Sequence, residues 1–357
     1  MLREEFELPS GLLNFVNGYL SGRKMRVRVG ESLSDEIPVV SGVPQGSILG
    51  PLLFDAYINR VANVELSKSA RVIMYADDLV YLKPLHENGS EKEMEADIAR
   101  IESAFQCLAL KLNAKKCKVM QMSASKQAFE MNIKISGTKL EVVDSYRYLG
   151  VHLDSQMTFS EHTRVTVTKV RQALGALVRT TRKWAPRKTF GKIYKGTLEP
   201  IMLYASDVCY PSQAGLQHSL ERVHRYAARL ASNNFIDEYS EILQSLGWKS
   251  FQQLATERSL TLLWSYCNGK RTAPQGVFER DGVGLRRSTR TGNGMTLALP
   301  QTTLAHVQAS ALNQAKRLWN ALTTEEVSCT TKKRFKKSLE SNKVFNRLKD
   351  RGLVRSL

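Results

Sequence analysis

The stretch Val72-Ile73-Met74-Tyr75-Ala76-Asp77-Asp78-Leu79-Val80-Tyr81-Leu82 decides how the first part of this chain folds. Two short, β-prone apolar runs flank a polar turn, a pattern that predicts a β-hairpin with Asp77 and Asp78 at its tip. Neighbouring carboxylates repel each other, so a fold that keeps both ionised usually neutralises them with a cation. Hard divalent ions such as Mg²⁺ take oxygen ligands of this kind and keep positions open for water and substrate phosphates. The stretch therefore predicts a hairpin suited to two-metal phosphoryl or nucleotidyl transfer. An Asp-Asp pair taken alone also fits a solvated turn.

Three further motifs accompany the hairpin along the chain. Upstream lies Ser41-Gly42-Val43-Pro44-Gln45-Gly46-Ser47-Ile48-Leu49-Gly50-Pro51-Leu52-Leu53-Phe54, and downstream lie Leu112-Asn113-Ala114-Lys115-Lys116-Cys117 and Tyr148-Leu149-Gly150-Val151-His152-Leu153. The first resembles the loop-and-helix motif of reverse transcriptases, and Tyr75–Asp78 resembles their catalytic hairpin. The other two resemble the lysine-bearing motif and the primer-grip hairpin of the same family. Order and spacing fit the non-LTR (LINE-type) retrotransposon branch best. The resemblance is strong over residues 25–155 and weaker over most of the remaining chain.

The resemblance implies a catalytic role for three residues and a nucleotide-binding role for a fourth. Asp77 and Asp78 would hold Mg²⁺, and Tyr75 would pack beside the incoming nucleotide, with simple strand packing as the alternative for the tyrosine. Lys116 would protonate the leaving pyrophosphate or neutralise its charge, although a lysine in this lysine-rich stretch also fits a solvated face. The implied reaction is the extension of a DNA 3′-OH by dNTPs on an RNA template.

Two other segments would position the nucleic acid. In Pro44-Gln45-Gly46, proline fixes φ and glycine permits backbone conformations closed to other residues. Such a turn lets the main chain approach a template base closely, with Gln45 supplying amide contacts. A plain turn in which Ser47 caps the next helix is the alternative. By resemblance, Tyr148-Leu149-Gly150 would position the primer end, although a glycine after an aromatic and an apolar residue also suits any hairpin.

One catalytic element of this family has no counterpart in the sequence. In the family an earlier strand carries another metal-binding Asp, in a Phe-Asp-type motif, and this Asp would bridge the ions. Asp35 and Asp55 are the only Asp residues before the hairpin, and neither has that strand context. The fingers and an upstream endonuclease have no counterpart either. The sequence is therefore identified as an N-terminally truncated reverse transcriptase of the non-LTR type.

Basic residues are concentrated in the second part of the chain. Residues 1–160 hold 19 Lys and Arg against 20 Asp and Glu, whereas residues 161–357 hold 33 against 14. The net charge of +18 thus comes from the second part. A neutral part followed by a basic one predicts a polyanionic partner, most simply nucleic acid. Generic cationic solubility is the alternative, and charge alone does not separate RNA from DNA, or either of them from an anionic membrane.

Hydrophobic periodicity predicts an α+β first part and an almost wholly helical second part. Residues 90–112 have apolar residues on one face and acids on the other, as in a long helix packed against one face of an antiparallel sheet. Further helices are expected at residues 10–20, 161–183, 188–203, 216–230, 239–246, 250–266 and 304–322, and from residue 332 onward. Further strands are expected at residues 25–29, 37–40, 118–122, 131–135 and 139–143, with a tight turn at Ser136-Gly137-Thr138.

By resemblance these elements fall into three parts. Residues 1–155 would form a partial polymerase palm, residues 156–215 thumb-like helices, and residues 216–357 a basic helical region with a linker near 268–290. The cations of the thumb-like helices would follow a duplex backbone. These cations are Arg171, Arg179, Arg182 and Lys183, with Trp184, Phe190 and Tyr194 interspersed. The basic run 332–337 fits a nucleic-acid contact, a nuclear-import patch or a solvated helix face.

Several features bear on the cellular compartment. No apolar run reaches the ~18 residues that a membrane span needs. The acidic N-terminus has no secretory h-region. The five cysteines, Cys107, Cys117, Cys209, Cys267 and Cys329, show neither metal-site spacing nor a disulfide pattern. We therefore expect reduced thiols in an intracellular protein of the nucleus or cytoplasm, neither secreted nor bound to a membrane.

Three functions remain open from the sequence. The first is an RNA-directed DNA polymerase that uses Mg²⁺, an RNA template, a DNA primer and dNTPs. The second is a catalytically inactive remnant that at most binds nucleic acid, which the absent upstream Asp favours. The third and most distant is an intron-maturase-like enzyme, which shares Tyr-Ala-Asp-Asp but is expected to lack the long region after the thumb. The oligomeric state does not follow from the sequence.

Overall fold

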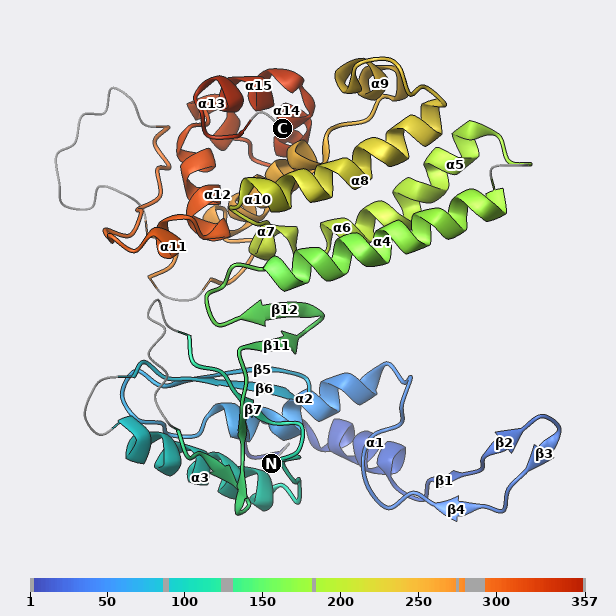
Figure 1. Ribbon diagram of the computed structural model, residues 1–357. Coiled ribbons are helices and arrows are strands. Elements are labelled where there is room, and N and C mark those ends of the chain that lie inside the picture. Colours follow the sequence, from blue (N-terminus) through green and yellow to red (C-terminus); the bar gives the residue numbers. More distant parts are fainter. Residues whose placement is uncertain are drawn as a thin grey trace. The chain divides into compact units, whose positions relative to one another are not determined.

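The computed structural model describes residues 3–85, 90–122, 131–181, 184–273, 276–279 and 293–355. Its internal contacts divide the chain into two compact units (Figure 1). The first unit comprises Met1–Val119 and Phe129–Val142, and the second comprises Met120–Ala128 and Val143–Leu357. The first unit combines helices with short strands, whereas the second is mostly helical.

The first unit contains three helices and a series of short strands among its described residues. The helices are α1 (Ser10–Leu20), α2 (Leu49–Ala62) and α3 (Ser90–Cys107). The strands are β1 (Lys24–Met25), β2 (Arg28–Val29), β3 (Ser32–Leu33), β4 (Ile37–Pro38), β5 (Arg71–Tyr75), β6 (Asp78–Leu82), β7 (Lys118–Val119), β8 (Lys134–Ile135), β9 (Thr138–Lys139) and β10 (Glu141–Val142). The helix predicted at residues 10–20 and the hairpin predicted around the Asp pair are confirmed.

The core of the first unit lies between α2, α3 and one face of the β5–β6 hairpin. Val61, Ile101 and Phe105 are buried on the helices, and Val72 and Met74 of β5 pack against them. Alternation along the strand explains this packing, because residues two apart point to the same face of a sheet. A second apolar cluster joins α3 to β8 and its neighbours. Helix α3 therefore supports both the hairpin and the later strands.

Two features of the first unit differ from the sequence-based expectation. The described strands form only two-stranded sheets, and β7 pairs with β10 in parallel, so the expected antiparallel sheet is replaced by separate pairs. The helix predicted over residues 90–112 ends at Cys107. Ala109 there has a φ of 51°, and Leu110 N–H donates to the carbonyl of Phe105, which closes the helix.

The second unit begins with one hairpin and continues as helices. The hairpin strands are β11 (Ser145–Tyr148) and β12 (Val151–Asp154). The helices are α4 (Ser160–Thr181), α5 (Arg187–Ile193), the π-helical turn η1 (Tyr194–Leu198), α6 (Glu199–Leu203), α7 (Ser206–Cys209), α8 (Ala214–Ser232), α9 (Tyr239–Leu246), α10 (Phe251–Cys267), α11 (Ala305–Gln308), α12 (Ala311–Asn320), α13 (Thr324–Val327), α14 (Lys332–Glu340) and α15 (Asn342–Asp350).

Two of the predicted helices are interrupted. The segment predicted as one helix over residues 188–203 is α5, η1 and α6 in succession. Pro200 in the first turn of α6 explains the wider turn before it, because proline has no N–H and its ring collides with the carbonyl four residues earlier. The segment predicted over residues 304–322 is divided at Ser310, whose hydroxyl caps α12 by accepting the N–H of Asn313.

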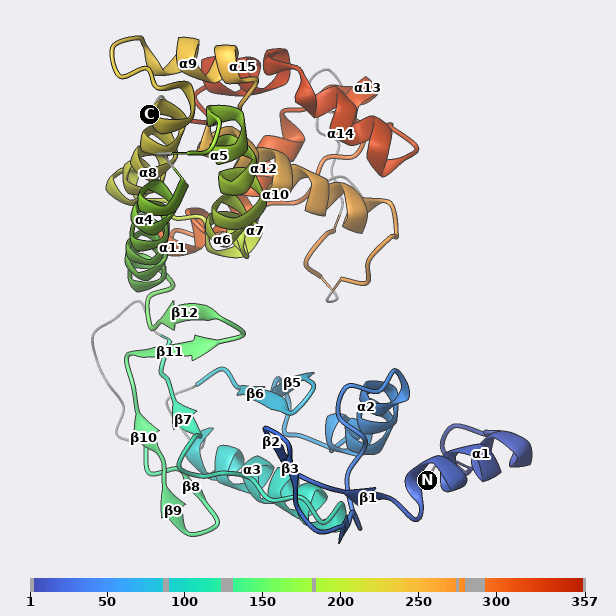
Figure 2. The same cartoon turned by 90° about the vertical axis from the view of Figure 1, so that its right-hand side faces the viewer.

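Two apolar clusters hold the second unit together. One lies among α4, α8 and the α5–α6 segment, with Val170, Tyr194 and Ala227 fully buried. The other lies among α10, α12 and α14 and is centred on Trp264 and Trp319. Helix α10 contacts α8 as well as α12 and α14, so it joins the two clusters (Figure 2).

Some expectations concern the chain as a whole. The β11–β12 hairpin groups with the helical unit, whereas the sequence analysis placed it with residues 1–155. The division into palm, thumb and basic region stays a prediction, and the linker expected near 268–290 falls partly outside the described residues. Each of the five cysteines is present as a thiol. Within the described residues, no helix has the length and apolar character needed to cross a membrane.

Candidate active site

The hairpin tip carries the two adjacent carboxylates on a tight turn. Strands β5 and β6 pair antiparallel up to Tyr75 and Asp78, which leaves Ala76 and Asp77 as the turn. Asp78 therefore begins a strand, and only Asp77 lies in the turn itself. Ala76 has a φ of 52°, which short hairpin turns favour but which is strained for a residue with a Cβ. The paired strands on either side hold this conformation.

The tip is open to solvent. The side chains of Asp77 and Asp78 are exposed, and in the described part of the chain neither forms a hydrogen bond or ion pair. Tyr75 is 65% exposed, so packing within the unit does not explain why a tyrosine stands at this position. Ile73, two residues earlier on the same face, is 50% exposed. One face of the hairpin is thus free, while the opposite face packs on the core.

The oxygen donors at the tip fit part of a magnesium shell. Mg²⁺ prefers octahedral oxygen coordination, and proteins often supply only one or two carboxylates while waters and substrate phosphates complete it. Asp77 and Asp78 are two such groups. Among the described residues, no cluster of three or more His, Cys, Asp or Glu side chains could hold a metal ion.

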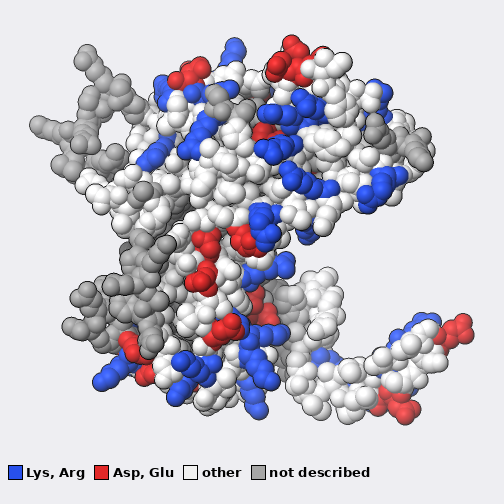
Figure 3. Space-filling model, in the orientation of Figure 1, with Lys and Arg blue, Asp and Glu red and all other residues white. Residues whose placement is uncertain are grey.

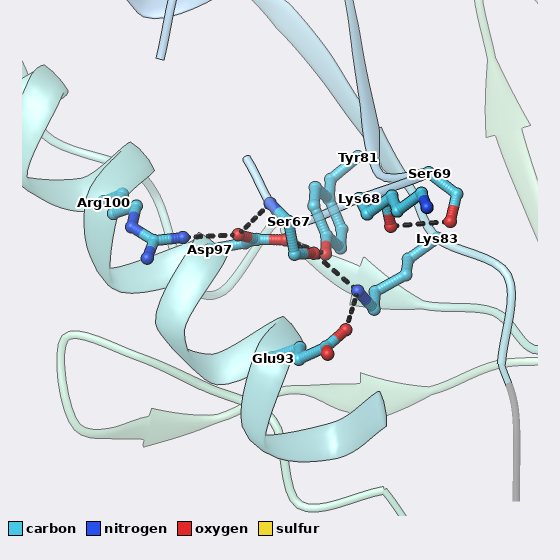
Figure 4. A network of polar contacts seen from close by, with 8 residues as sticks. All are labelled: Ser67, Lys68, Ser69, Tyr81, Lys83, Glu93, Asp97 and Arg100. Carbon is cyan, nitrogen blue, oxygen red and sulfur yellow. Dashed lines mark hydrogen bonds and ion pairs between the residues drawn. The ribbon is translucent and has the colours of Figure 1, made fainter. Parts of the chain in front are cut away.

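A buried carboxylate anchors the other end of β6 (Figure 4). Asp97 of α3 is fully buried and accepts hydrogen bonds from the N–H and hydroxyl of Ser67, at 2.8 and 2.5 Å. The hydroxyl of Tyr81 donates to Asp97 at 2.8 Å, and Arg100 Nη1 donates to it at 2.9 Å. Helix α3 thus fixes both the loop before β5 and the end of β6.

Lys83 adds a positive charge to this network. Its side chain is 3% exposed, and its Nζ donates to Ser67 Oγ at 2.5 Å and to Glu93 Oε2 at 2.6 Å. Burial alone would raise the pKa of Asp97, but the hydrogen bonds from Ser67 and Tyr81 and the charge of Lys83 outweigh it and lower that pKa. Burial and the bond to Asp97 raise the pKa of Tyr81. An ionised Asp97 therefore receives charge-assisted hydrogen bonds, which are stronger than neutral ones.

The sequence analysis placed the acids of this helix on its solvent face, which is wrong for Asp97. Met94, Ile98 and Ile101 form part of the apolar stripe of α3. Asp97 stands three residues after Met94 and four before Ile101, so helical spacing puts it on the same stripe. A single acid within an apolar stripe was the available signal. Its burial is possible because four donor groups surround the carboxylate.

The loop before α2 is a turn that needs its glycine. Ser47 N–H donates to the carbonyl of Pro44 at 3.4 Å, and Gly46 between them has a φ of 78°, as a type II turn requires. The hydroxyl of Ser47 accepts the N–H of Gly50 at 3.0 Å, which confirms the helix-capping role. Gln45 is exposed at the corner of the turn. Contact between this turn and a template stays a prediction.

Lys116 lies in a turn directly before β7. Its N–H donates to the carbonyl of Asn113 at 2.9 Å, and its side chain is exposed. Lys116, the Pro44–Gly46 turn and the hairpin tip all belong to the first unit. Among the described residues no hydrogen bond or ion pair joins these three groups.

The β11–β12 hairpin has a turn of a different type. Leu149 and Gly150 both have positive φ, 46° and 84°, the type I′ pattern that matches hairpin twist. The hydroxyl of Tyr204 donates to the carbonyl of Leu149 at 2.6 Å. A Cβ added to Gly150 would lie 3.3 Å from the Tyr204 ring. Tyr204, which sequence motifs did not single out for this role, therefore holds the turn that follows Tyr148.

Helix α4 presents cations along its exposed face. Arg164, Arg171 and Arg179 are exposed. Arg164 pairs with Glu161, whereas Arg171 and Arg179 have no ion-pair partner among the described residues. Arg182 and Lys183 lie outside the described residues. Lys and Arg side chains gather on the face of the second unit seen in Figure 3, where acidic side chains are fewer.

The aromatic residues expected among these cations are mostly unavailable. Trp184 is 73% exposed, but Phe190 is 6% exposed and Tyr194 is fully buried. Both belong to the apolar cluster between α4 and α8, because they fall on the inner face of their helical segment. Of the three, only Trp184 is placed where a base could stack on it.

Comparison with known proteins gives a family for the first part of the chain. Residues 3–153 match the family described as reverse transcriptase (RNA-dependent DNA polymerase). The RNA-directed DNA polymerase from mobile element jockey of Drosophila melanogaster is 29% identical over 217 residues, 56% of this chain and 23% of that protein. The retrovirus-related Pol polyprotein from type-1 retrotransposable element R1 of Nasonia vitripennis is 28% identical over 220 residues, 58% of this chain and 65% of that protein. No solved structure matches the chain.

The matched range contains the Pro44–Gly46 turn, the Asp77–Asp78 tip and Lys116. Residues 3–153 are therefore similar to the reverse transcriptase family, and the two relatives are named as an RNA-directed DNA polymerase of a mobile element and a Pol polyprotein of a retrotransposable element. This confirms the resemblance found in the sequence. The chain spans less than two thirds of the length of either relative.

Proposed function

We propose that residues 3–153 supply the hairpin side of a reverse-transcriptase centre, which extends a DNA 3′-OH with dNTPs on an RNA template. The observation that carries the proposal is the exposed Asp77–Asp78 tip within a domain of this family. Carboxylates with no protein partner are free to bind a cation. The buried Asp97 network at the far end of β6 supports the proposal, because it holds the strand that carries Asp78 in place.

Each residue of the proposed centre has a separate task. Asp77 and Asp78 would hold Mg²⁺, and the ion would neutralise charge on the triphosphate and activate the attacking hydroxyl. Lys116 protonates the leaving pyrophosphate or neutralises its charge. Tyr75 packs beside the incoming nucleotide. The Pro44-Gln45-Gly46 turn positions the template base.

The second unit is proposed to hold the template–primer duplex. Its support is the excess of basic over acidic residues beyond residue 160 and the unpaired Arg171 and Arg179 on α4. The Tyr148-Leu149-Gly150 segment would meet the primer end, with Tyr204 holding its turn. In this division residues 1–155 act as palm, residues 156–215 as thumb and residues 216–357 as a basic extension. The free thiols fit an intracellular enzyme.

One observation favours a second function. Arg171 and Arg179 of α4 are exposed and have no ion-pair partner among the described residues, so they would bind a nucleic-acid backbone whether or not the hairpin holds a metal ion. Such a protein would bind template and primer without joining nucleotides. The second candidate is therefore a nucleic-acid-binding protein without polymerase activity.

Primer extension on poly(rA)/oligo(dT) separates the two functions. The 357-residue chain is assayed with Mg²⁺ and Mn²⁺ as wild type, Asp77→Asn and Asp35→Asn, the last being an exposed acid outside the hairpin. The polymerase function is supported if the wild type extends the primer, and if Asp77→Asn, but not Asp35→Asn, lowers the rate of extension on the order of 10²-fold or more. Duplex binding without extension supports the second function. Equal extension by wild type and Asp77→Asn would show that the hairpin is not the catalytic centre.

A further inference from the structure

Helix α14 carries a dense stripe of positive charge. Its nine residues include five cations and one acid. The cations are Lys332, Lys333, Arg334, Lys336 and Lys337, and all are exposed. The helix lies beyond the residues that match the reverse transcriptase family. The proposed catalytic centre therefore does not explain this stripe.

The inner side of α14 is fixed in the core. Phe335 is 0% exposed and Leu339 is 2% exposed, and both belong to the C-terminal apolar cluster. The Phe335 ring lies 6.1 Å from the ring of Trp264 and 5.9 Å from that of Trp319. The hydroxyl of Thr331 caps the helix by accepting a backbone N–H of the first turn. The helix cannot rotate, so the cations keep their place on the surface.

No carboxylate of the described chain forms an ion pair with these five cations. Lys332 and Lys336 are four residues apart, and so are Lys333 and Lys337. Like charges at this spacing lie next to each other on a helix and repel. These cations repel one another and have no counter-charges of their own in the described chain. Binding of an external polyanion relieves this repulsion and is therefore favourable.

We propose that the exposed face of α14 binds the phosphodiester backbone of a nucleic-acid strand. The inference rests on the proposed function in one respect, since an RNA-directed polymerase meets such a strand as its single-stranded template. Contacts to phosphates carry no sequence information. The surface therefore binds poly(U) and poly(dT) alike and weakens as salt is added.

Two other partners fit this face less well. Among residues 313–355, all of which the structure describes, no large apolar side chain is exposed, so α14 has nothing to bury in a bilayer interface. A nuclear-import receptor that binds a basic run as an extended peptide would have to unfold α14. Unfolding would expose Phe335, one of the largest fully buried side chains.

The α14 surface is separate from the one proposed on α4. Helix α14 packs on α10, α13 and α15, whereas α4 packs on α8, α6 and β12. Figures 1 and 2 both show the two helices on different sides of the second unit. A long strand held at one surface has a raised effective concentration at the other, so the two surfaces together bind more tightly than either alone.

The test removes charge from α14 in the full chain. The α14 variant combines Lys332→Gln, Lys333→Gln, Lys336→Gln and Lys337→Gln. The matched control combines Lys68→Gln, Lys92→Gln, Lys134→Gln and Lys139→Gln, all exposed lysines of the first unit. Glutamine has nearly the helix propensity of lysine, so the α14 variant is expected to fold, which circular dichroism checks. Filter binding to poly(U) and poly(dT) is measured over a salt series, with an Arg171→Gln, Arg179→Gln variant of α4 alongside.

We expect the slope of log K against log[salt] to flatten by about 3 in the α14 variant, since each lost single-strand phosphate contact removes about 0.7. The control is expected to keep the wild-type slope. An unchanged slope in the α14 variant, or an equal change in the control, would overturn the proposal. If the α14 variant lost binding to phosphatidylserine–phosphatidylcholine vesicles but still bound poly(U) like the wild type, the face would be assigned to a membrane instead. An unchanged slope in the α4 variant alone would count against the proposed template–primer surface and not against α14.

Discussion

Asp97 is the residue on which the geometry of the hairpin depends most. Removing a carboxylate from water costs free energy, which is offset here by the hydrogen bonds of Ser67, Tyr81 and Arg100 and by the charge of Lys83. Tyr81 and Asp78 lie on the same short strand. Loosening Asp97 should therefore loosen the strand that carries the proposed metal ligand.

We expect Asp97→Asn to lower the free energy of unfolding by about 3 kcal/mol, because the change leaves the buried Lys83 without its full counter-charge. Urea unfolding measures the loss. Glu93→Gln is the matched control, since Glu93 contacts the same lysine but its side chain is 59% exposed, and it should cost less than about 1 kcal/mol. Equal losses in the two variants would contradict the anchoring role.

The lowered pKa of Asp97 gives this stabilisation a pH dependence. The unfolded carboxyl has a pKa of about 3.9. Because the folded value lies below that, the contribution is present above about pH 4 and is lost as pH falls through the folded pKa. The acid limb of the stability curve should accordingly be shallower in Asp97→Asn.

His224 is a second buried titratable side chain, in the helical unit. It is fully buried, with Nδ1 2.8 Å from the Tyr194 hydroxyl and Nε2 2.9 Å from the carbonyl of Lys249. A carbonyl only accepts, so Nε2 carries the proton and Nδ1 accepts from Tyr194. Burial lowers the pKa of His224, and the charge of Glu221 opposes this only in part.

We expect the stability of the chain to fall as pH drops below about 6.5, where the unfolded state takes up a proton that folded His224 does not. His224→Gln should be less stable at neutral pH, because it disturbs both hydrogen bonds, but its stability should depend less on pH between about 7 and 5. Thermal unfolding over a pH series measures this. The variant His162→Gln provides a comparison, because burial also lowers the pKa of His162. An unchanged pH dependence in His224→Gln would assign the effect to another group.

The sequence predicted those turns and helices that depend on residues close together in the chain. The Asp77–Asp78 tip, helix α1 and the Ser136–Gly137 turn follow from short-range periodicity and turn residues. The partners of Asp97 come from residues 67 to 100, and Tyr204 meets a carbonyl 55 residues away. Contacts at such separations depend on tertiary packing, which no local period encodes.

At the scale of elements, the β11–β12 turn depends on a contact with another part of the unit. Leu149 has a φ of 46°, which is strained for a residue with a side chain. The hydroxyl of Tyr204 donates to the carbonyl of this residue, and the Tyr204 ring covers Gly150. The turn is therefore held by a residue that follows α6.

We expect Tyr204→Phe to destabilise this turn by about 1 kcal/mol, since the ring stays and one hydrogen bond is lost. Hydrogen exchange of the amides of residues 149–151 should become faster, while that of the α8 amides should not change. Tyr226→Phe is a suitable control, because Tyr226 is 50% exposed and its hydroxyl makes no hydrogen bond among the described residues. Unaltered exchange at the turn in Tyr204→Phe would show that the backbone pairing alone fixes it.

At the scale of the whole molecule, charge is divided as the sequence count indicated. The first unit presents two unpaired carboxylates at a strand turn, whereas the second presents cations on α4 and α14. The two surfaces suit partners of opposite charge, which are a metal cation for the carboxylates and a polyanion for the cations. The sequence showed the uneven charge but not that Phe190 and Tyr194 are buried, because burial depends on which helix face packs.

The α4 surface leads to a separate expectation for duplex binding. Each cation that neutralises a phosphate releases a counterion, which adds about 0.9 to the salt slope for a duplex. Changing Arg171, Arg179, Arg182 and Lys183 together to glutamine should therefore flatten the slope for poly(rA)/oligo(dT) by a few units, measured by filter binding with the full chain. Arg164→Gln is the internal control on the same helix. The Arg164 guanidinium already pairs with Glu161, so the Arg164→Gln variant should alter the salt slope by less than one unit. A slope that depends instead on lysines of the first unit would show that α4 is not the duplex surface.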